Sequence, residues 1–172
     1  MSEVTIHVLA TRDAVREAIA RIPQEALAGG ALANGMMARA GLALLGRVKR
    51  AYIAKARGGT DEAGGRWVPL KPATIARRRG RGKGGATRSV EILRNTGVLL
   101  NSMHVADAGH GGVSVVAGAR YTKWHHMGTA KLPQRRLWPE PSKWPDSWWA
   151  DITDQVSGGI AAIAVELARD AR

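Results

Sequence analysis

The chain begins with apolar residues that alternate with polar ones. Val4, Ile6 and Val8 follow the period-two pattern that is typical of a short, half-buried strand. Thr11 is a suitable N-cap for a short helix after that strand, and Pro23 ends it because proline cannot continue a helix. The start of the chain therefore predicts one strand followed by one short helix.

A long helical pattern occupies residues 24–56. Apolar side chains recur there mostly at three- and four-residue steps, at Leu27, Ala31, Leu42, Leu45, Val48 and Tyr52. Several glycines interrupt the pattern, and each glycine inside a helix costs about 0.5–1 kcal/mol relative to alanine. The helix is either broken near Asn34 and Gly35 or held by close packing against a neighbour. We favour a break followed by one long helix.

Glycine and charge mark the middle of the chain as loops. Residues 58–65 predict an exposed glycine-rich loop, and residues 73–79 predict a short helix. From 77 to about 88, arginine and lysine alternate with glycine, which opposes a packed structure. We expect a flexible basic loop at about residues 77–88.

Regular structure returns in the second half. Residues 100–106 and 113–117 have strand character, and the glycines between them predict a β-hairpin. A turn of helix is expected at 121–127 and a further short strand at 136–138. Ile152, Val156, Ile160, Ile163 and Leu167 then lie along one side of a C-terminal helix. The chain as a whole predicts a single α+β domain over residues 1–172, with a long N-terminal helix packed on a small, mainly antiparallel β-sheet and a C-terminal helix.

Composition narrows the possible functions. The chain has 172 residues, a net charge of +12 and no cysteine. The absence of cysteine excludes disulfides, thiolate metal sites and a cysteine nucleophile. The positive charge favours an anionic partner such as nucleic acid, an acidic protein surface or an anionic membrane. No apolar run approaches the roughly 18 residues that span a bilayer, and no signal peptide is visible, so we expect the chain to stay in the cytoplasm of the cell that makes it.

The basic segment is the strongest chemical signal. Glu91 is its only acidic residue, against nine cations at Arg66, Lys71, Arg77, Arg78, Arg79, Arg81, Lys83, Arg88 and Arg94. Two interpretations have equal weight. The loop binds DNA phosphates, each of which adds roughly 0.9 to the salt dependence of the affinity; or it becomes ordered against acidic neighbours in an assembly.

Signals for catalysis are weak. Gly80, Gly82 and Gly85 match G-x-G-x-x-G, but a triple-arginine stretch replaces the strand that a nucleotide-binding turn requires. His125 and His126 are adjacent and lack the spacing of metal ligands, so we expect one to face the core and the other to be exposed. We predict no metal, no cofactor and no enzymatic activity.

Two further groups of residues have structural explanations. Carboxylates that lie near each other, Asp61 with Glu62 and Asp151 with Asp154, are expected to be solvated or to cap helices. Packing on the body or on a neighbour is expected, in preference to base stacking, for Trp138, Trp144, Trp148 and Trp149.

Four segments, in order, carry a resemblance to a known family. Their sequences are GRWVPL at 65–70, ILRNTGVL at 92–99, Tyr121 with WHHMGT at 124–129, and LPQRRL at 132–137. In this order, after a long helix, they resemble the virion-morphogenesis or tail-completion family of tailed bacteriophages.

The resemblance implies a small α+β structural protein of the virion. Such a protein acts at the head–tail junction (neck or tail end) as a ring subunit, with six copies favoured, and it is assembled in the bacterial host cytoplasm. Its partners are other neck and tail proteins, and packaged DNA passes through the channel. The implied anchors are Trp67, Pro69, Leu70, Gly97, Tyr121, His125 and Gly128, while Arg135 and Arg136 face a neighbouring subunit. A DNA-binding protein that uses the Arg- and Gly-rich loop is the main alternative, and a hydrolase or nuclease in the hairpin region is a more distant one.

Overall fold

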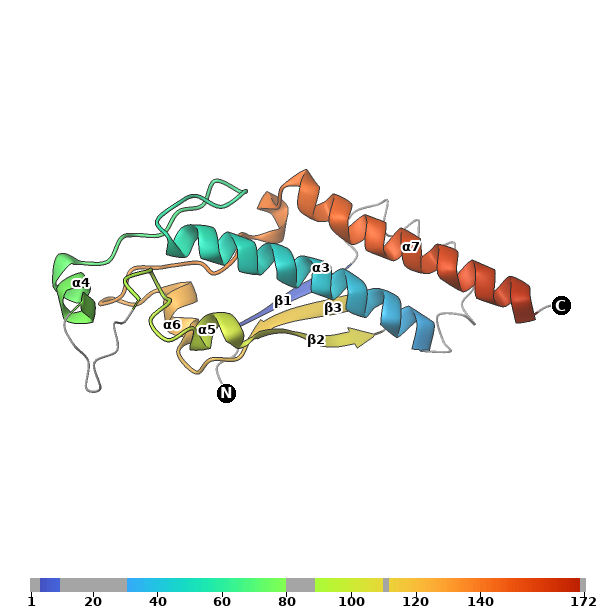
Figure 1. Ribbon diagram of the computed structural model, residues 1–172, viewed down its shortest axis with the longest axis horizontal. Helices are drawn as coiled ribbons and strands as arrows, with labels where there is room; N and C mark the ends of the chain where they lie inside the picture. Colours follow the sequence, from blue (N-terminus) through green and yellow to red (C-terminus); the bar gives the residue numbers. More distant parts are fainter. Residues whose placement is uncertain (1–3, 10–30, 80–88, 110–111, 171–172) are drawn as a thin grey trace. The chain divides into compact units, whose positions relative to one another are not determined.

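The computed structural model describes residues 4–9, 31–79, 89–109 and 112–170. It has the predicted α+β class. In chain order the elements are β1 (Val4–Leu9), α3 (Ala31–Ala56), α4 (Pro72–Arg79), α5 (Val98–Asn101), β2 (Met103–Gly109), β3 (Gly112–Ala117), α6 (Thr122–Met127), the 3-10 turn η1 (Pro141–Lys143) and α7 (Asp146–Asp170) (Figure 1). The short helix predicted at 11–22 lies outside the described residues.

The sheet has three strands in the order β1-β3-β2. The predicted β-hairpin corresponds to β2 and β3, and the predicted first strand is β1. The hairpin begins at Met103, three residues later than expected, because α5 occupies the preceding positions. The amides of Asn101 and Ser102 donate to the carbonyls of Gly97 and Val98, both at 2.9 Å, and close a helical turn there. Gly97 starts this turn with φ of 80°, a left-handed conformation that favours glycine.

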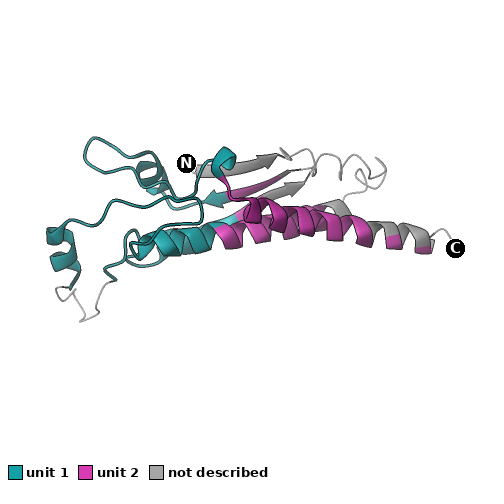
Figure 2. Cartoon of the chain, turned by 90° about the horizontal axis from the view of Figure 1, so that it is seen from above, with its two compact units in different colours: residues 1–4, 48–104, 116–143 teal, residues 5–47, 105–115, 144–172 magenta. Residues whose placement is uncertain are grey.

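The chain divides into two compact units, coloured separately in Figure 2. Unit 1 consists of residues 1–4, 48–104 and 116–143, and unit 2 of residues 5–47, 105–115 and 144–172. Each unit combines segments that are far apart in the sequence. The two units are therefore not consecutive domains.

In unit 2, the first part of α3 packs on the hairpin strands and on α7. A Cβ atom at Gly41 would overlap the side chains of Val113 and Val105. A Cβ atom at Gly159 of α7 would lie 2.8 Å from Cβ of Met36. Both glycines therefore allow an approach that a larger residue would prevent. This is the predicted arrangement of a long helix on an antiparallel sheet with a C-terminal helix beside it.

The break that we favoured near Asn34 and Gly35 is wrong, because α3 runs through both positions without interruption. Burial explains the continuity. Met36, Ala40 and Leu44 are all at most 1% exposed. Burying such side chains is worth far more than the helix propensity that one half-buried glycine loses. The other alternative, a helix held by close packing against a neighbour, is therefore the correct one.

The tryptophans of unit 2 pack as expected. Trp144 contacts the rings of Trp148 and Trp149, with centroids 5.6 and 5.1 Å apart. All three are buried, together with Ile152 and Val156 further along α7. In the same unit, Asp151 binds Arg47 with 2.6 Å between Oδ2 and Nε, so it is ion-paired. None of the described helices is both long and apolar enough to cross a membrane.

Candidate functional site

Unit 1 is organised around Tyr52, a side chain near the end of α3. Tyr52 is fully buried and meets the ring of Trp67 edge-on, with 5.0 Å between centroids. Its hydroxyl donates a hydrogen bond of 2.6 Å to the carbonyl of Leu93. Burial raises the pKa of Tyr52 well above its usual value, so the phenol stays protonated and remains a donor. Tyr52 therefore ties α3 to the segments at 65–70 and 92–99.

Trp67 connects the same region to the segment at 132–137. It is 3% exposed, and its indole Nε1 donates to the carbonyl of Arg136 at 2.7 Å. The ammonium of Lys55 lies 5.3 Å from the centre of the indole ring and donates to the same carbonyl at 3.1 Å. The side chains of Lys55 and Trp67 thus both bind the backbone carbonyl of Arg136, which is distant from them in the sequence.

Lys55 and Asp61 form a buried ion pair. Their Nζ and Oδ2 atoms are 2.8 Å apart, and the side chains are 3% and 1% exposed. Oδ1 of Asp61 also accepts hydrogen bonds from the amides of Ala63 and Gly65, at 3.1 and 2.7 Å. Burial lowers the pKa of Lys55, while the hydrogen bond and the charge of Asp61 oppose that shift. The expectation that Asp61 is solvated is wrong, because the loop folds back over its carboxylate.

Arg135 is the centre of a second set of bonds. Its guanidinium donates from Nε and Nη2 to the carbonyl of Val68, at 3.2 and 3.1 Å, and its amide donates to the carbonyl of His125 at 2.8 Å. The amide of Leu137 donates to Nδ1 of His126 at 3.3 Å. The strand predicted at 136–138 is therefore wrong: residues from other segments, and not a neighbouring strand, bind this backbone.

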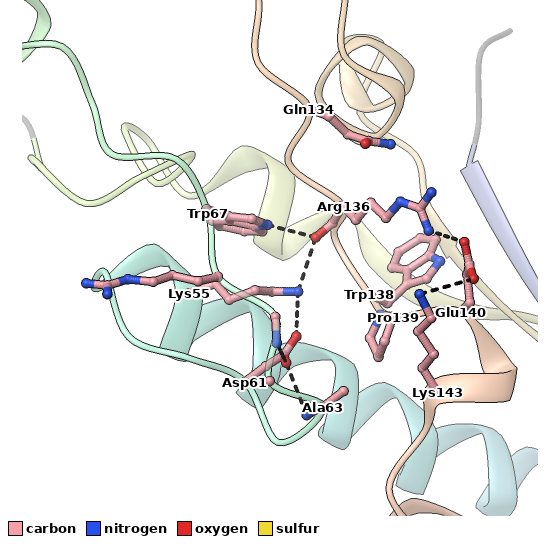
Figure 3. Close-up of a pocket in the computed structure, with 13 residues that line it drawn as sticks. Lys55, Asp61, Ala63, Trp67, Gln134, Arg136, Trp138, Pro139, Glu140 and Lys143 are labelled. Carbon is pink, nitrogen blue, oxygen red and sulfur yellow. Dashed lines mark hydrogen bonds and ion pairs between the residues drawn. The ribbon is translucent and has the colours of Figure 1, made fainter.

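A cavity of about 350 Å³ lies between these segments (Figure 3). Trp67 and Trp138 supply aromatic walls, and Lys55 and Asp61 supply the buried charges. At the rim, Arg136 pairs with Glu140, and Nζ of Lys143 lies 3.8 Å from the same carboxylate. The residues that line the cavity include no serine, threonine, cysteine, tyrosine or histidine. The described residues form no cluster of three potential metal ligands. The cavity therefore combines aromatic walls with charged groups, which suits it to binding.

The predicted anion-binding residues occupy different environments. Arg77, Arg78 and Arg79 belong to α4, so a flexible loop that starts at 77 is wrong for these three positions. Nη1 of Arg78 donates to the carbonyls of Ser89 and Glu91, at 3.2 and 2.8 Å, whereas Arg77 and Arg79 are exposed. Arg81 and Lys83 lie outside the described residues.

Arg135 and Arg136, which we expected to face a neighbouring subunit, also differ. Arg135 is only 6% exposed, and Val68 already accepts from its guanidinium. Burial lowers its pKa, with a further contribution from the charge of Arg78. The side chain of Arg136 is 46% exposed. Of this pair, Arg136 alone presents its charge at the surface.

The residues that the family resemblance implies as structural anchors are buried to different extents. Trp67 is buried, Leu70 is half-buried, and Pro69 is exposed. Gly97 and Gly128 have φ of 80° and 76°, which favours glycine at both turns. A Cβ atom at Gly128 would also lie 3.0 Å from the backbone of Gln134, so a side chain there is strained.

The histidines contradict the expected split between a core-facing and an exposed side chain. His125 and His126 are both half-buried. Burial lowers the pKa of each, and the charges of Arg135 and Arg136 lower them further. Tyr121, which is 37% exposed, meets the ring of His125 edge-on at 5.8 Å.

Sequence reasoning missed the outer face of α6. We use this name for Arg120, Lys123, Trp124 and Met127, all of which are exposed. Lys123, Trp124 and Met127 belong to α6, where steps of three and four residues place them on one side of the helix, and Arg120 lies in the turn before it. That spacing was a usable signal, but the sequence cannot tell whether such a side faces the core or the solvent.

Comparison with known protein families, with curated proteins and with solved structures found no match for the chain.

Proposed function

We propose that the chain is a structural subunit of a tailed bacteriophage that acts at the head–tail junction, forms a ring and helps to join the completed tail to the head. One observation supports this proposal. Three of the four segments that carry the family resemblance are hydrogen-bonded to one another within unit 1, and Tyr52 of α3 contacts the fourth. Trp67 binds Arg136, Arg135 binds Val68 and His125, and Tyr52 links Trp67 to Leu93.

These bonds suggest what the shared motifs do. Trp67 and Arg135 shape a scaffold, because their side-chain donors are used on backbone carbonyls of other segments. A buried arginine that satisfies a distant carbonyl specifies how two segments meet. A ring subunit needs such a rigid body, since its function depends on the surfaces that it presents to neighbours. The net charge of +12 also fits a ring that surrounds DNA.

The decisive experiment is deletion of the gene from the genome that carries it. We expect electron micrographs to show filled heads and separate tails, and we expect a plasmid copy to restore joined, infectious particles. Joined particles without the protein would refute the proposal. The ring is tested separately by light scattering and by the symmetry seen in particles, and a monomer in both settings would exclude it.

A second candidate is direct DNA binding. Arg77 and Arg79 are exposed on α4 and form no ion pair with the described residues. Binding of the purified protein to duplex DNA at increasing salt measures this activity. A steep loss of affinity with salt, reduced by roughly 0.9 in slope for each phosphate contact that Arg77→Ser or Arg79→Ser removes, would support it. Binding without salt dependence would reject it.

A further inference from the structure

The outer face of α6 exposes an unusual amount of apolar surface. Trp124 is 51% exposed and Met127 is 64% exposed. All six tryptophans lie within the described residues, and the other five are at most 6% exposed. Tryptophan and methionine are enriched at the centres of protein interfaces and are rarely left in water by a chain that has a core available.

The polar residues of this face all carry positive charge. Arg120 and Lys123 flank Trp124, and Lys131 is exposed in the loop that follows α6. None of the three forms an ion pair with the described residues, and the sequence contains no acidic residue from Ala119 to Pro139. The apolar centre of this face is therefore surrounded by positive charge alone among these residues.

We propose that the outer face of α6 docks a different protein, through a surface with apolar residues at its centre and carboxylates at its edge. This inference rests on the proposed function, because it treats the outer face of α6 as a surface that joins the chain to another protein. Trp124 and Met127 lose their contact with water in the complex, and Arg120 and Lys123 pair with carboxylates of the partner. Charge complementarity guides the approach, while burial of the indole supplies most of the affinity.

The charges of the chain argue against a second copy as the occupant. The chain has 26 basic and 14 acidic residues. Four described carboxylates are already used in ion pairs within the chain, at Asp61, Glu91, Glu140 and Asp151. A second copy would therefore bring mainly like charge to this face, which destabilises an interface.

Nucleic acid and membrane also fit less well than protein. Phosphates would use the cations but leave Met127, the more exposed apolar side chain, without a contact. A lipid surface calls for an amphipathic helix with a broad apolar face, and α6 has six residues. A protein surface satisfies the indole, the thioether and the cations together.

The test uses the full-length protein and a synthetic, tryptophan-free amphipathic peptide of leucine and glutamate. Because Trp124 is the exposed tryptophan, acrylamide quenches its fluorescence preferentially. We expect the acidic peptide to reduce this quenching and a leucine–lysine peptide to have no effect. In peptide anisotropy, Trp124→Ala and Lys123→Glu should each weaken binding about tenfold or more. Val165→Ser, which changes an apolar side chain of similar exposure on α7, is the control and should bind like the parent.

Several outcomes would overturn the inference. The first is that all the variants bind the peptide with equal affinity. The second is that the acidic peptide does not protect Trp124 from quenching, or that duplex DNA or phosphatidylglycerol vesicles protect it in place of the peptide. The third is that raising the protein concentration protects Trp124 without any peptide. The last outcome would indicate a second copy. Failure here differs from failure of the proposed function, because particles that join normally without the gene would refute the junction role whether or not the peptide binds.

Discussion

Replacing Trp67 by alanine tests whether the bonded segments of unit 1 form its core. The side chain is 3% exposed, contacts the ring of Tyr52 and donates to the carbonyl of Arg136. Deleting a buried tryptophan typically costs about 3–5 kcal/mol, because both apolar contact and volume are lost. That is a large part of the roughly 5–15 kcal/mol that stabilises a typical domain.

A second variant separates the contribution of the indole hydrogen bond from that of the apolar contacts. Trp67→Phe keeps most of the apolar contact but removes the indole N–H, which leaves Lys55 as the side-chain donor that remains on the Arg136 carbonyl. The lost hydrogen bond should cost about 1–2 kcal/mol. For a chain of this length, each kcal/mol lowers the melting temperature by roughly 2–4 °C. We therefore expect a drop of about 6–20 °C for alanine and a clearly smaller one for phenylalanine.

Thermal melts followed by circular dichroism measure these shifts. Trp124→Ala is the matched control, because that indole is 51% exposed and its loss should cost about 1 kcal/mol or less. An unchanged midpoint for Trp67→Ala, or a shift equal to that of the control, would show that the segments do not depend on this ring.

Three further predictions concern buried or bonded charges. Lys55→Met leaves the buried carboxylate of Asp61 without its cation and should destabilise by about 3–5 kcal/mol in urea unfolding, and a change near zero would mean that the pair is solvated. The pKa of His126 is lowered below its ordinary 6.5 by burial, so the stability from its neutral ring is present above that pH and is lost as the pH falls through the lowered pKa. His126→Asn should flatten the dependence of the unfolding free energy on pH below about pH 6.5. An unchanged slope would contradict this. Arg78→Ser should cost about 1–3 kcal/mol, because two charge-assisted hydrogen bonds are lost, whereas exposed Arg77→Ser should leave the melting temperature nearly unchanged; equal effects would refute the distinction.

Local patterns in the sequence were enough to predict most elements. The strand β1, the hairpin, α6 and α7 follow the predicted positions within a few residues, because each depends on periodicity and on nearby glycine or proline. The four motif segments were also visible in the sequence, including the glycine turn at Gly97. The bonds among these segments were not visible, since they join positions that are up to 69 residues apart.

Tertiary packing decided the points at which local rules failed. Gly35 did not break α3, because the buried side chains around it outweigh the helix propensity of one residue. The sequence around Asp61 predicts an exposed loop. Its carboxylate is buried because Lys55, near the end of α3, and the amides of Ala63 and Gly65 all bond to it. Arg135 and Arg136 are adjacent and chemically identical, yet Arg135 is buried on Val68 and Arg136 stays at the surface.

The sequence alone thus determined the α+β class, the positions of most helices and strands, and a basic, cysteine-free composition that favours an anionic partner. Which positive charges stay exposed was decided only by the tertiary structure. Burial uses the guanidiniums of Arg78 and Arg135 on backbone carbonyls and leaves Arg77 and Arg79 exposed. Trp124 is exposed for a related reason: the side of α6 that meets the core depends on contacts with distant segments, which a helical period of 3.6 residues does not specify.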